Sequence, residues 1–221
     1  MPDWLQRVVA IAAFVVALPV VAVLAVLVRM DSPGGSFFVS NRVGANGDSF
    51  RLFKLRTMQV EAPAAGPGIS VHHDPRVTRI GRYLRHAHLD ELPQLWNVIR
   101  GEMLLVGPRP EDPRFVDLTI PLHRRVFTAK PGITGLTQLA YADEAALLDP
   151  ADPEGHYRTT ILPAKLDLDR RYLDRRSVGL DCWILAQTAM TAVGRPPSSA
   201  AIEARVGGPQ GATDGGGAGE A

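Results

Sequence analysis

Residues 8–28 run for 21 positions without a charged side chain. As a straight helix this stretch would be about 31 Å long, close to the hydrocarbon thickness of a bilayer. A cleaved signal peptide is the alternative, but its hydrophobic region would be unusually long and no small-residue cleavage pattern follows. The run therefore predicts a membrane-inserted helical segment over residues 1–30.

Pro19 lies in the middle of this apolar run. A proline inside a helix costs about 3 kcal/mol, and in lipid the freed backbone groups need other partners. We therefore expect Pro19 to be the membrane break. Two shapes stay open: a kinked helix that crosses the bilayer once, or a re-entrant helix-break-helix that enters and leaves by one face. Arg7 and Arg29 place positive charge at both ends, and Trp4 suits the headgroup level.

Composition adds few constraints to this 221-residue chain. With 46% hydrophobic residues there is enough apolar material for a packed core. The formal net charge of +1 indicates no nucleic-acid partner. Cys182 is the single cysteine, which excludes an intrachain disulfide and a zinc site built on cysteines.

The rest of the chain predicts an α+β fold in which a small, mostly helical domain, residues 31–194, follows the membrane segment. Strand-like residues 37–39 and 50–56 flank the turn Gly44-Ala45-Asn46-Gly47, which predicts a short β-hairpin. Residues 138–140 are expected to form another short strand.

Helical patterns recur further along the chain. Within residues 74–101 apolar side chains recur at helical spacing, with Gly101 at the expected end. Residues 156–176 and 178–193 also read as helices, and we expect amphipathic helices at the membrane surface. Residues 195–221, rich in Gly, Ala and Pro, predict a disordered tail.

Asp90 and Glu91 are adjacent carboxylates at the start of a predicted helix. The positive helix N-terminus would help keep Asp90 ionised, as a carboxylate nucleophile requires, and Glu91 could hold Mg²⁺. Helix capping is the alternative interpretation, and spacing alone favours it.

Basic residues gather around these carboxylates in sequence. Arg85, the nearest, suits a phosphate, because arginine presents a planar fork of donors. Lys54 and Arg56 end a strand and could also meet a phosphate, although an exposed edge is the simpler reading. His86 and His88 could bind a transition metal, but no established metal motif supports this. No dinucleotide fingerprint, P-loop or nucleophile elbow occurs.

Several motifs occur in an order that resembles the bacterial sugar transferases, the small monotopic phosphoglycosyl transferases. They extend over roughly residues 8–193 and are Asp31-Ser32-Pro33-Gly34, Arg42-Val43-Gly44, Lys54-Leu55-Arg56-Thr57-Met58, Leu89-Asp90-Glu91-Leu92-Pro93, Val106-Gly107-Pro108-Arg109-Pro110 and Lys130-Pro131-Gly132-Ile133-Thr134-Gly135. This many ordered matches outweighs capping as the sole role of Asp90.

The resemblance implies transfer of a sugar 1-phosphate from a UDP-sugar to polyprenyl phosphate, with release of UMP. It implies that Asp90 is the nucleophile that carries the phosphosugar and that Glu91 is the Mg²⁺ ligand. It also implies that Arg85 contacts phosphate and that Arg109 lies beside the active site. The family's membrane segment is re-entrant at a Ser-Pro pair, where this chain has Leu18-Pro19.

The resemblance further implies an enzyme of the bacterial inner membrane, with its catalytic domain on the cytoplasmic face and membrane lipids as partners; a homo-oligomer is compatible with it. Residues 136–141 depart from the family pattern, which leaves the sugar open. Two other functions remain: a metal-dependent phosphohydrolase of lipid diphosphates, and a non-catalytic membrane scaffold for glycan assembly.

Overall fold

The computed structural model describes residues 1–60, 69–71 and 74–207. The elements up to residue 106 are α1 (Asp3–Asp31), β1 (Phe37–Val43), η1 (Ala45–Gly47), β2 (Ser49–Leu55), α2 (Arg79–His86), η3 (Leu89–Glu91), α3 (Gln94–Arg100) and β3 (Leu104–Val106). Those that follow are η4 (Pro113–Phe115), α4 (Pro121–Phe127), β4 (Gly132–Thr134), α5 (Leu136–Ala140), α6 (Glu144–Leu147), α7 (Pro153–His156), η5 (Tyr157–Ile161), α8 (Leu162–Arg175), α9 (Val178–Ala192) and α10 (Ser199–Val206).

The predicted hairpin is confirmed. β1 and β2 pair antiparallel, from Phe37 opposite Leu55 to Val43 opposite Ser49. The turn between them works because Asn46 and Gly47 both take positive φ angles, 57° and 81°, which Asn and Gly tolerate best. A second, two-stranded sheet pairs β3 with β4 in parallel.

The helical stretch predicted at residues 74–101 is divided into α2, η3 and α3. Thr78 caps α2 by accepting a hydrogen bond from Gly81 N at 3.0 Å. Gly101 ends α3 with φ 81°, as predicted. The division matters because it places a tight turn, η3, between two helices.

Two expectations about later segments are wrong. Residues 138–140 belong to helix α5, and the strand lies just before them as β4. The predicted disordered tail contains α10, which starts at the capping residue Ser198 and buries Ile202 and Val206 in the main core. These two side chains are four residues apart and therefore share one helix face. Residues 208–221 lie outside the described part of the chain.

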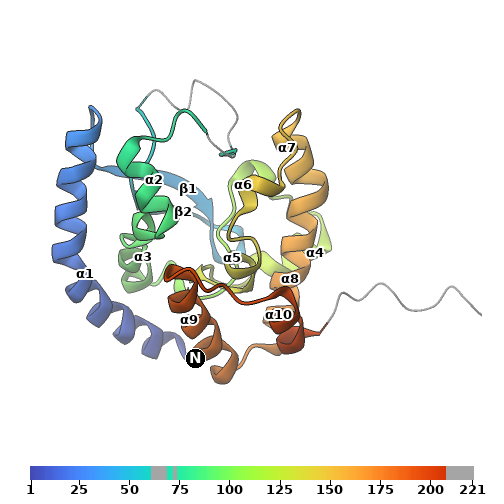
Figure 1. Ribbon diagram of the computed structural model, residues 1–221. Coiled ribbons are helices and arrows are strands. Elements are labelled where there is room, and N and C mark those ends of the chain that lie inside the picture. Colours follow the sequence, from blue (N-terminus) through green and yellow to red (C-terminus); the bar gives the residue numbers. More distant parts are fainter. Residues whose placement is uncertain (61–68, 72–73, 208–221) are drawn as a thin grey trace, which may run out of the picture.

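Figure 1 shows how the elements surround the hairpin. α1 forms one side of the molecule with α2 and α3 beside it, and α8 with α4 and α7 forms the opposite side. α9 and α10 close the lower end. The main hydrophobic core joins these parts: it includes Ala10 of α1, Val98 of α3, Leu136 of α5, Tyr172 of α8 and Ile184 of α9.

The long first helix continues through Pro19, so the predicted break into two helices is wrong. Proline's fixed φ is compatible with a helix, and the cost is one lost hydrogen bond and local bending. α1 bends in Figure 1 without breaking, a shape compatible with either way of meeting the membrane. Its outer face carries exposed apolar side chains, among them Val15, Val16, Val23 and Val26. Among the described residues, this helix alone is long and apolar enough to cross a membrane.

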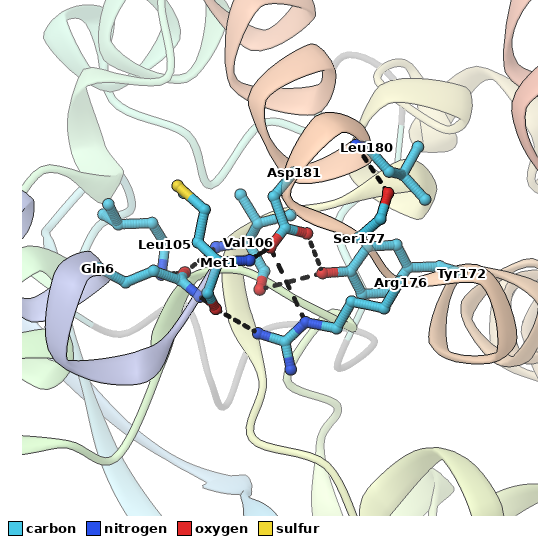
Figure 2. Close-up of polar contacts among 9 residues, drawn as sticks. All are labelled: Met1, Gln6, Leu105, Val106, Tyr172, Arg176, Ser177, Leu180 and Asp181. Carbon is cyan, nitrogen blue, oxygen red and sulfur yellow. Dashed lines mark hydrogen bonds and ion pairs between the residues drawn. The ribbon is translucent and has the colours of Figure 1, made fainter.

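Both halves of α1 lie against the same domain. Near its start, Gln6 is fully buried, and its Oε1 accepts hydrogen bonds from Leu105 N at 3.0 Å and Val106 N at 3.1 Å (Figure 2). Near its end, Val21 and Val28 pack in a second core cluster. The Gln6 amide thus accepts hydrogen bonds from two backbone N–H groups of β3 and positions the first turns of α1 against this strand.

Figure 2 also shows a buried carboxylate, Asp181 of α9, beside this attachment. Tyr172 donates a hydrogen bond to it at 2.7 Å, the amino terminus of Met1 forms an ion pair with it, and Arg176 Nε lies 3.9 Å away. α1, α8 and α9 therefore meet at one polar junction within the core.

We predict that Gln6→Met destabilises the protein, because it leaves two buried backbone N–H groups without acceptors. The cost should be roughly 2 kcal/mol or more. Thermal unfolding in detergent should show a midpoint lowered by about 4–8 °C. The exposed Gln59 is the matched control, and Gln59→Met should leave the midpoint unchanged. An unchanged midpoint for Gln6→Met would mean that water reaches the two N–H groups.

Candidate active site

Asp90 and Glu91 lie in the turn η3, between α2 and α3. His88 precedes it in a left-handed backbone conformation, φ 53°, which redirects the chain after α2. Pro93 has no backbone N–H, and α3 starts after it, at Gln94. Asp90 therefore does not cap α3, and the capping interpretation is wrong for this residue.

Glu91 forms an ion pair with Lys54 of β2, whose Nζ lies 2.6 Å from Glu91 Oε1. Both side chains are largely covered, at 16% and 20% exposure. Burial alone would raise the pKa of Glu91, but the positive charges of Lys54 and Arg109 outweigh it and lower the pKa to about 2. Glu91 is thus ionised across the physiological range.

Asp90 is 8% exposed. Burial raises the pKa of its carboxyl above the ordinary value; Lys54 opposes this rise, Glu91 adds to it, and Arg85 opposes it. The expectation that a helix N-terminus favours the ionised form is therefore outweighed by the loss of water. Two adjacent carboxyl groups are given different acidities by their surroundings, a pattern typical of paired catalytic acids.

Arg85 reaches the site from the last turn of α2. Its Nε donates to Thr57 Oγ1 at 2.8 Å and its Nη1 to Ser70 Oγ at 3.0 Å. These bonds hold the guanidinium where its positive charge acts on Asp90 and Asp74. Arg85 and Asp90 are thus close in space, as the sequence suggests.

Arg109 lies in the rigid loop between β3 and η4. Gly107 in this loop and Gly132 in β4 allow the two backbones to approach closely, because a Cβ on Gly132 would lie 2.1 Å from Gly107 N. Burial lowers the pKa of Arg109, but the negative charges of Glu91, Glu144 and Glu111 outweigh it and raise the pKa above its ordinary value. Arg109 therefore belongs to the same electrostatic site as Glu91.

Arg56 is not brought to this site, which corrects its assignment as a phosphate ligand. Its guanidinium donates three hydrogen bonds to backbone carbonyls of the turn after α1: Nε to Gly35 at 2.6 Å, Nη1 to Pro33 at 2.7 Å and Nη2 to Ser32 at 2.9 Å. β2 ends at Leu55, so Arg56 lies just after the strand, and its donors are used by the backbone of residues 32–35. Arg56 holds the turn that returns the chain from α1 to the hairpin.

The residues present fit a magnesium ion that is shared with a substrate. The ion pair with Lys54 uses Glu91 Oε1 and leaves Oε2 as an oxygen that could bind the metal ion. No group of three or more His, Cys, Asp or Glu side chains within the described ranges could form a metal cage. Mg²⁺ usually needs only one or two carboxylates, with substrate phosphates and waters as its other ligands. His86 and His88 are both exposed and outside any such group, and His72 and His73 lie outside the described residues.

An apolar groove of about 590 Å³ lies between α1 and the segment that carries the carboxylates. Its floor and walls are small or aliphatic side chains of α1 together with Leu89 and Leu92, which flank Asp90 and Glu91 in the sequence; the α1 residues are Val9, Ala12, Ala13, Val16, Ala17 and Val20. The groove thus reaches the residues on either side of the two carboxylates in the sequence.

A buried polar network behind Arg109 is a part of the site that the sequence did not predict. Lys165 Nζ lies 3.1 Å from Glu111 Oε1 and 2.7 Å from Glu144 Oε2, and it donates to Tyr157 OH at 2.8 Å. Arg42 of β1 faces this network. The only signal for it was the Arg42-Val43-Gly44 motif, which says nothing about partners distant in the sequence.

Comparison with known proteins identifies the family to which the chain belongs. The family model for "Bacterial sugar transferase" matches residues 2–195. The UDP-N-acetylgalactosamine-undecaprenyl-phosphate N-acetylgalactosaminephosphotransferase of Aeromonas hydrophila is 35% identical over 195 residues, which are 85% of this chain and 43% of that protein. The UDP-glucose:undecaprenyl-phosphate glucose-1-phosphate transferase of Caulobacter vibrioides is 42% identical over 124 residues, which are 55% of this chain and 46% of that protein.

This chain thus spans about half the length of those two relatives. A third relative, exopolysaccharide production protein PSS of Rhizobium leguminosarum bv. phaseoli, matches over nearly its whole length. It is 31% identical over 192 residues, which are 84% of this chain and 91% of that protein. The family model and this relative together cover almost all of the folded part, and the chain belongs to the bacterial sugar transferase family.

Proposed function

We propose that the protein transfers a sugar 1-phosphate from a UDP-sugar to a polyprenyl phosphate such as undecaprenyl phosphate. The products are UMP and a polyprenyl-diphospho-sugar. The observation that carries the proposal is the position of Asp90, next to the Lys54–Glu91 ion pair and in a turn whose neighbouring residues Leu89 and Leu92 line an apolar groove. Relatives named for transfer to undecaprenyl phosphate support this class of reaction.

Asp90 acts as the nucleophile in this proposal. A carboxylate oxygen attacks the β-phosphorus of the UDP-sugar, the bond from that phosphorus to the bridging oxygen breaks, and UMP leaves with the oxygen. The phosphosugar is then held on Asp90 as an acyl phosphate. An oxygen of polyprenyl phosphate attacks the same phosphorus, and the Asp90 carboxylate is restored.

Positive charge around Asp90 offsets the repulsion between an anionic nucleophile and an anionic phosphate. Lys54 of β2, Arg85 of α2 and Arg109 of the loop after β3 act on the two carboxylates. Mg²⁺ at Glu91 would add positive charge at the phosphate oxygens. The burial of Asp90, at 8% exposure, limits the access of water to the acyl phosphate.

We further propose that α1, bent but unbroken, enters and leaves the membrane by one face, and that the domain lies on the cytoplasmic face of the inner membrane. Both halves of α1 pack on the same domain, and a helix that crossed the bilayer would carry part of this domain into the hydrocarbon. Arg7 and Arg29 at its two ends favour the cytoplasmic side. Such a location suits the first membrane step of surface glycan or exopolysaccharide assembly.

Removal of the nucleophile should abolish turnover. With a panel of UDP-sugars, Mg²⁺ and polyprenyl phosphate in detergent, the protein should release UMP, and Asp90→Asn should slow this by about three orders of magnitude or more. The exposed Asp48 provides the control, since Asp48→Asn should keep full activity. Full turnover by Asp90→Asn would exclude the mechanism.

Product analysis in the same assay separates the alternatives. A lipid-linked sugar that forms only with polyprenyl phosphate supports the transferase. Free sugar phosphate or inorganic phosphate made without a lipid acceptor would support the phosphohydrolase. Absence of any turnover with every UDP-sugar would support the scaffold.

The acidity of Asp90 should set the acid limb of the pH profile. Because burial raises the pKa of Asp90, kcat/KM for the UDP-sugar should fall as the pH is lowered, and this fall should begin at a higher pH than the titration of an exposed aspartate would give. Lys54→Met removes a charge that lowers this pKa, so the limb should move to higher pH, whereas Lys130→Met, at a partly exposed pair with Asp3, should leave it in place. A limb that stays in place, or moves to lower pH, in Lys54→Met contradicts this assignment.

The groove on α1 should bind the isoprenoid chain of the acceptor. Ala12→Phe fills part of it and should raise KM for polyprenyl phosphate about tenfold, equivalent to about 1.4 kcal/mol, without changing UMP release in the first half-reaction. Val23 is exposed on α1 but does not line the groove, so Val23→Phe serves as the control. Equal KM values for the two variants would place the acceptor elsewhere.

A further inference from the structure

Arg42 is a partly buried cation near the end of β1, one residue before a hydrogen bond joins the strand to the loop that follows Arg109. That hydrogen bond runs from Val43 N to Glu111 O, at 3.0 Å. The Nε of Arg42 is buried without a hydrogen-bond partner. Within the described residues, its guanidinium has no carboxylate at ion-pair distance.

A second guanidinium, that of Arg109, faces Arg42. Burial lowers the pKa of Arg42, Glu111 opposes this, and the positive charge of Arg109 lowers the pKa further. Arg109 likewise forms no ion pair with the described part of the chain. Two cations are therefore held together in a poorly hydrated place without a direct counter-ion.

The acidic side chains around this arginine pair are already engaged by other cations. Glu111 and Glu144 are bonded to Lys165 at 3.1 and 2.7 Å. Asp112 is paired with Arg114 at 3.0 Å, and Glu91 with Lys54 at 2.6 Å. Glu111 and Glu144 share Lys165, so these four acids have three direct cationic partners, and together with Arg42 and Arg109 the group carries one positive charge in excess.

Uncompensated buried charge is costly, and such cost is often retained at sites that bind a ligand of opposite charge. Arginine forks suit phosphate oxygens in particular. We propose that Arg42 and Arg109 form a subsite for the phosphate that leaves with the nucleotide, the α-phosphate of the UDP-sugar and of the product UMP. This inference rests on the proposed function and adds Arg42 to the substrate-binding residues.

The acceptor lipid also carries a phosphate, but its tail groove lies elsewhere. The groove is lined by α1, Leu89 and Leu92. Arg42 instead faces Glu111, Asp112 and Tyr157, which come from the η4 and η5 side of the molecule. Figure 1 shows α1 and the helices around α8 on opposite sides of the hairpin. The nucleotide phosphate is therefore the better occupant of the arginine pair.

The test compares Arg42→Gln with the unaltered full-length protein in detergent, by thermal unfolding with and without UMP. Removal of an unpaired buried cation should leave the ligand-free midpoint unchanged or raised. The stabilisation by UMP should be lost, whereas any shift caused by uridine, which has no phosphate, should be kept. KM for the UDP-sugar should rise about tenfold or more, and Arg42→Lys should recover part of the loss.

Arg51 is the matched control, because it is an exposed arginine on the paired strand β2. Arg51→Gln should keep the UMP shift and the KM. A lowered ligand-free midpoint for Arg42→Gln would overturn the proposal in favour of a structural role, and so would an unchanged UMP shift. Loss of stabilisation by a short-chain polyprenyl phosphate, with the UMP shift intact, would assign the pair to the acceptor and overturn it as well. If the unaltered protein binds UMP but transfers no sugar phosphate, the proposed function fails while the subsite stands.

Discussion

The ion pair between Lys54 and Glu91 is the interaction on which the site depends. It joins the hairpin to the turn that carries both carboxylates, at 2.6 Å and largely away from solvent. Lys54 stabilises the ionised form of Glu91. Its positive charge also offsets the repulsion between the two neighbouring carboxylates, so Asp90 can be buried beside the negative charge of Glu91. The pair therefore allows two adjacent acids to have different acidities.

α1 lies beside the segment that carries the two carboxylates, where Leu89 and Leu92 pack in the same cluster as Val21 and Val28. The helix packs along the domain at both halves, and its small side chains leave a groove that Leu89 and Leu92 also line. In the proposed reaction, a lipid-tailed acceptor and a water-soluble donor reach one phosphorus from different directions. Arg42 and Arg109 lie away from the groove, on the side that we propose for the donor.

Sequence reasoning predicted the parts of the molecule that local chemistry determines. The hairpin follows from Asn46 and Gly47, which accept positive φ angles, and the end of α3 follows from Gly101. The meeting of Asp90, Glu91, Lys54 and Arg85 was anticipated through motif resemblance rather than through spacing. Pro19 was expected to interrupt the helix, but a single proline bends a helix that packing supports on one side.

The remaining features depend on contacts between distant segments. Nothing near Arg56 indicates that its donors are used by the turn at residues 32–35. α10 is stable because Ile202 and Val206 pack in a core against α5 and α8, which the composition of the tail does not reveal. Likewise, the surplus charge of Arg42 becomes evident only when each neighbouring acid is seen to have another partner.

The most direct measurement is the mass of proteolytic peptides from protein incubated with a UDP-sugar and Mg²⁺ and then quenched in acid. A phosphosugar mass should appear on the peptide that contains Asp90, localise to that side chain, and disappear when polyprenyl phosphate is added before the quench. UMP formation with no adduct on Asp90, or with the adduct on another residue, would contradict the role assigned to this carboxylate.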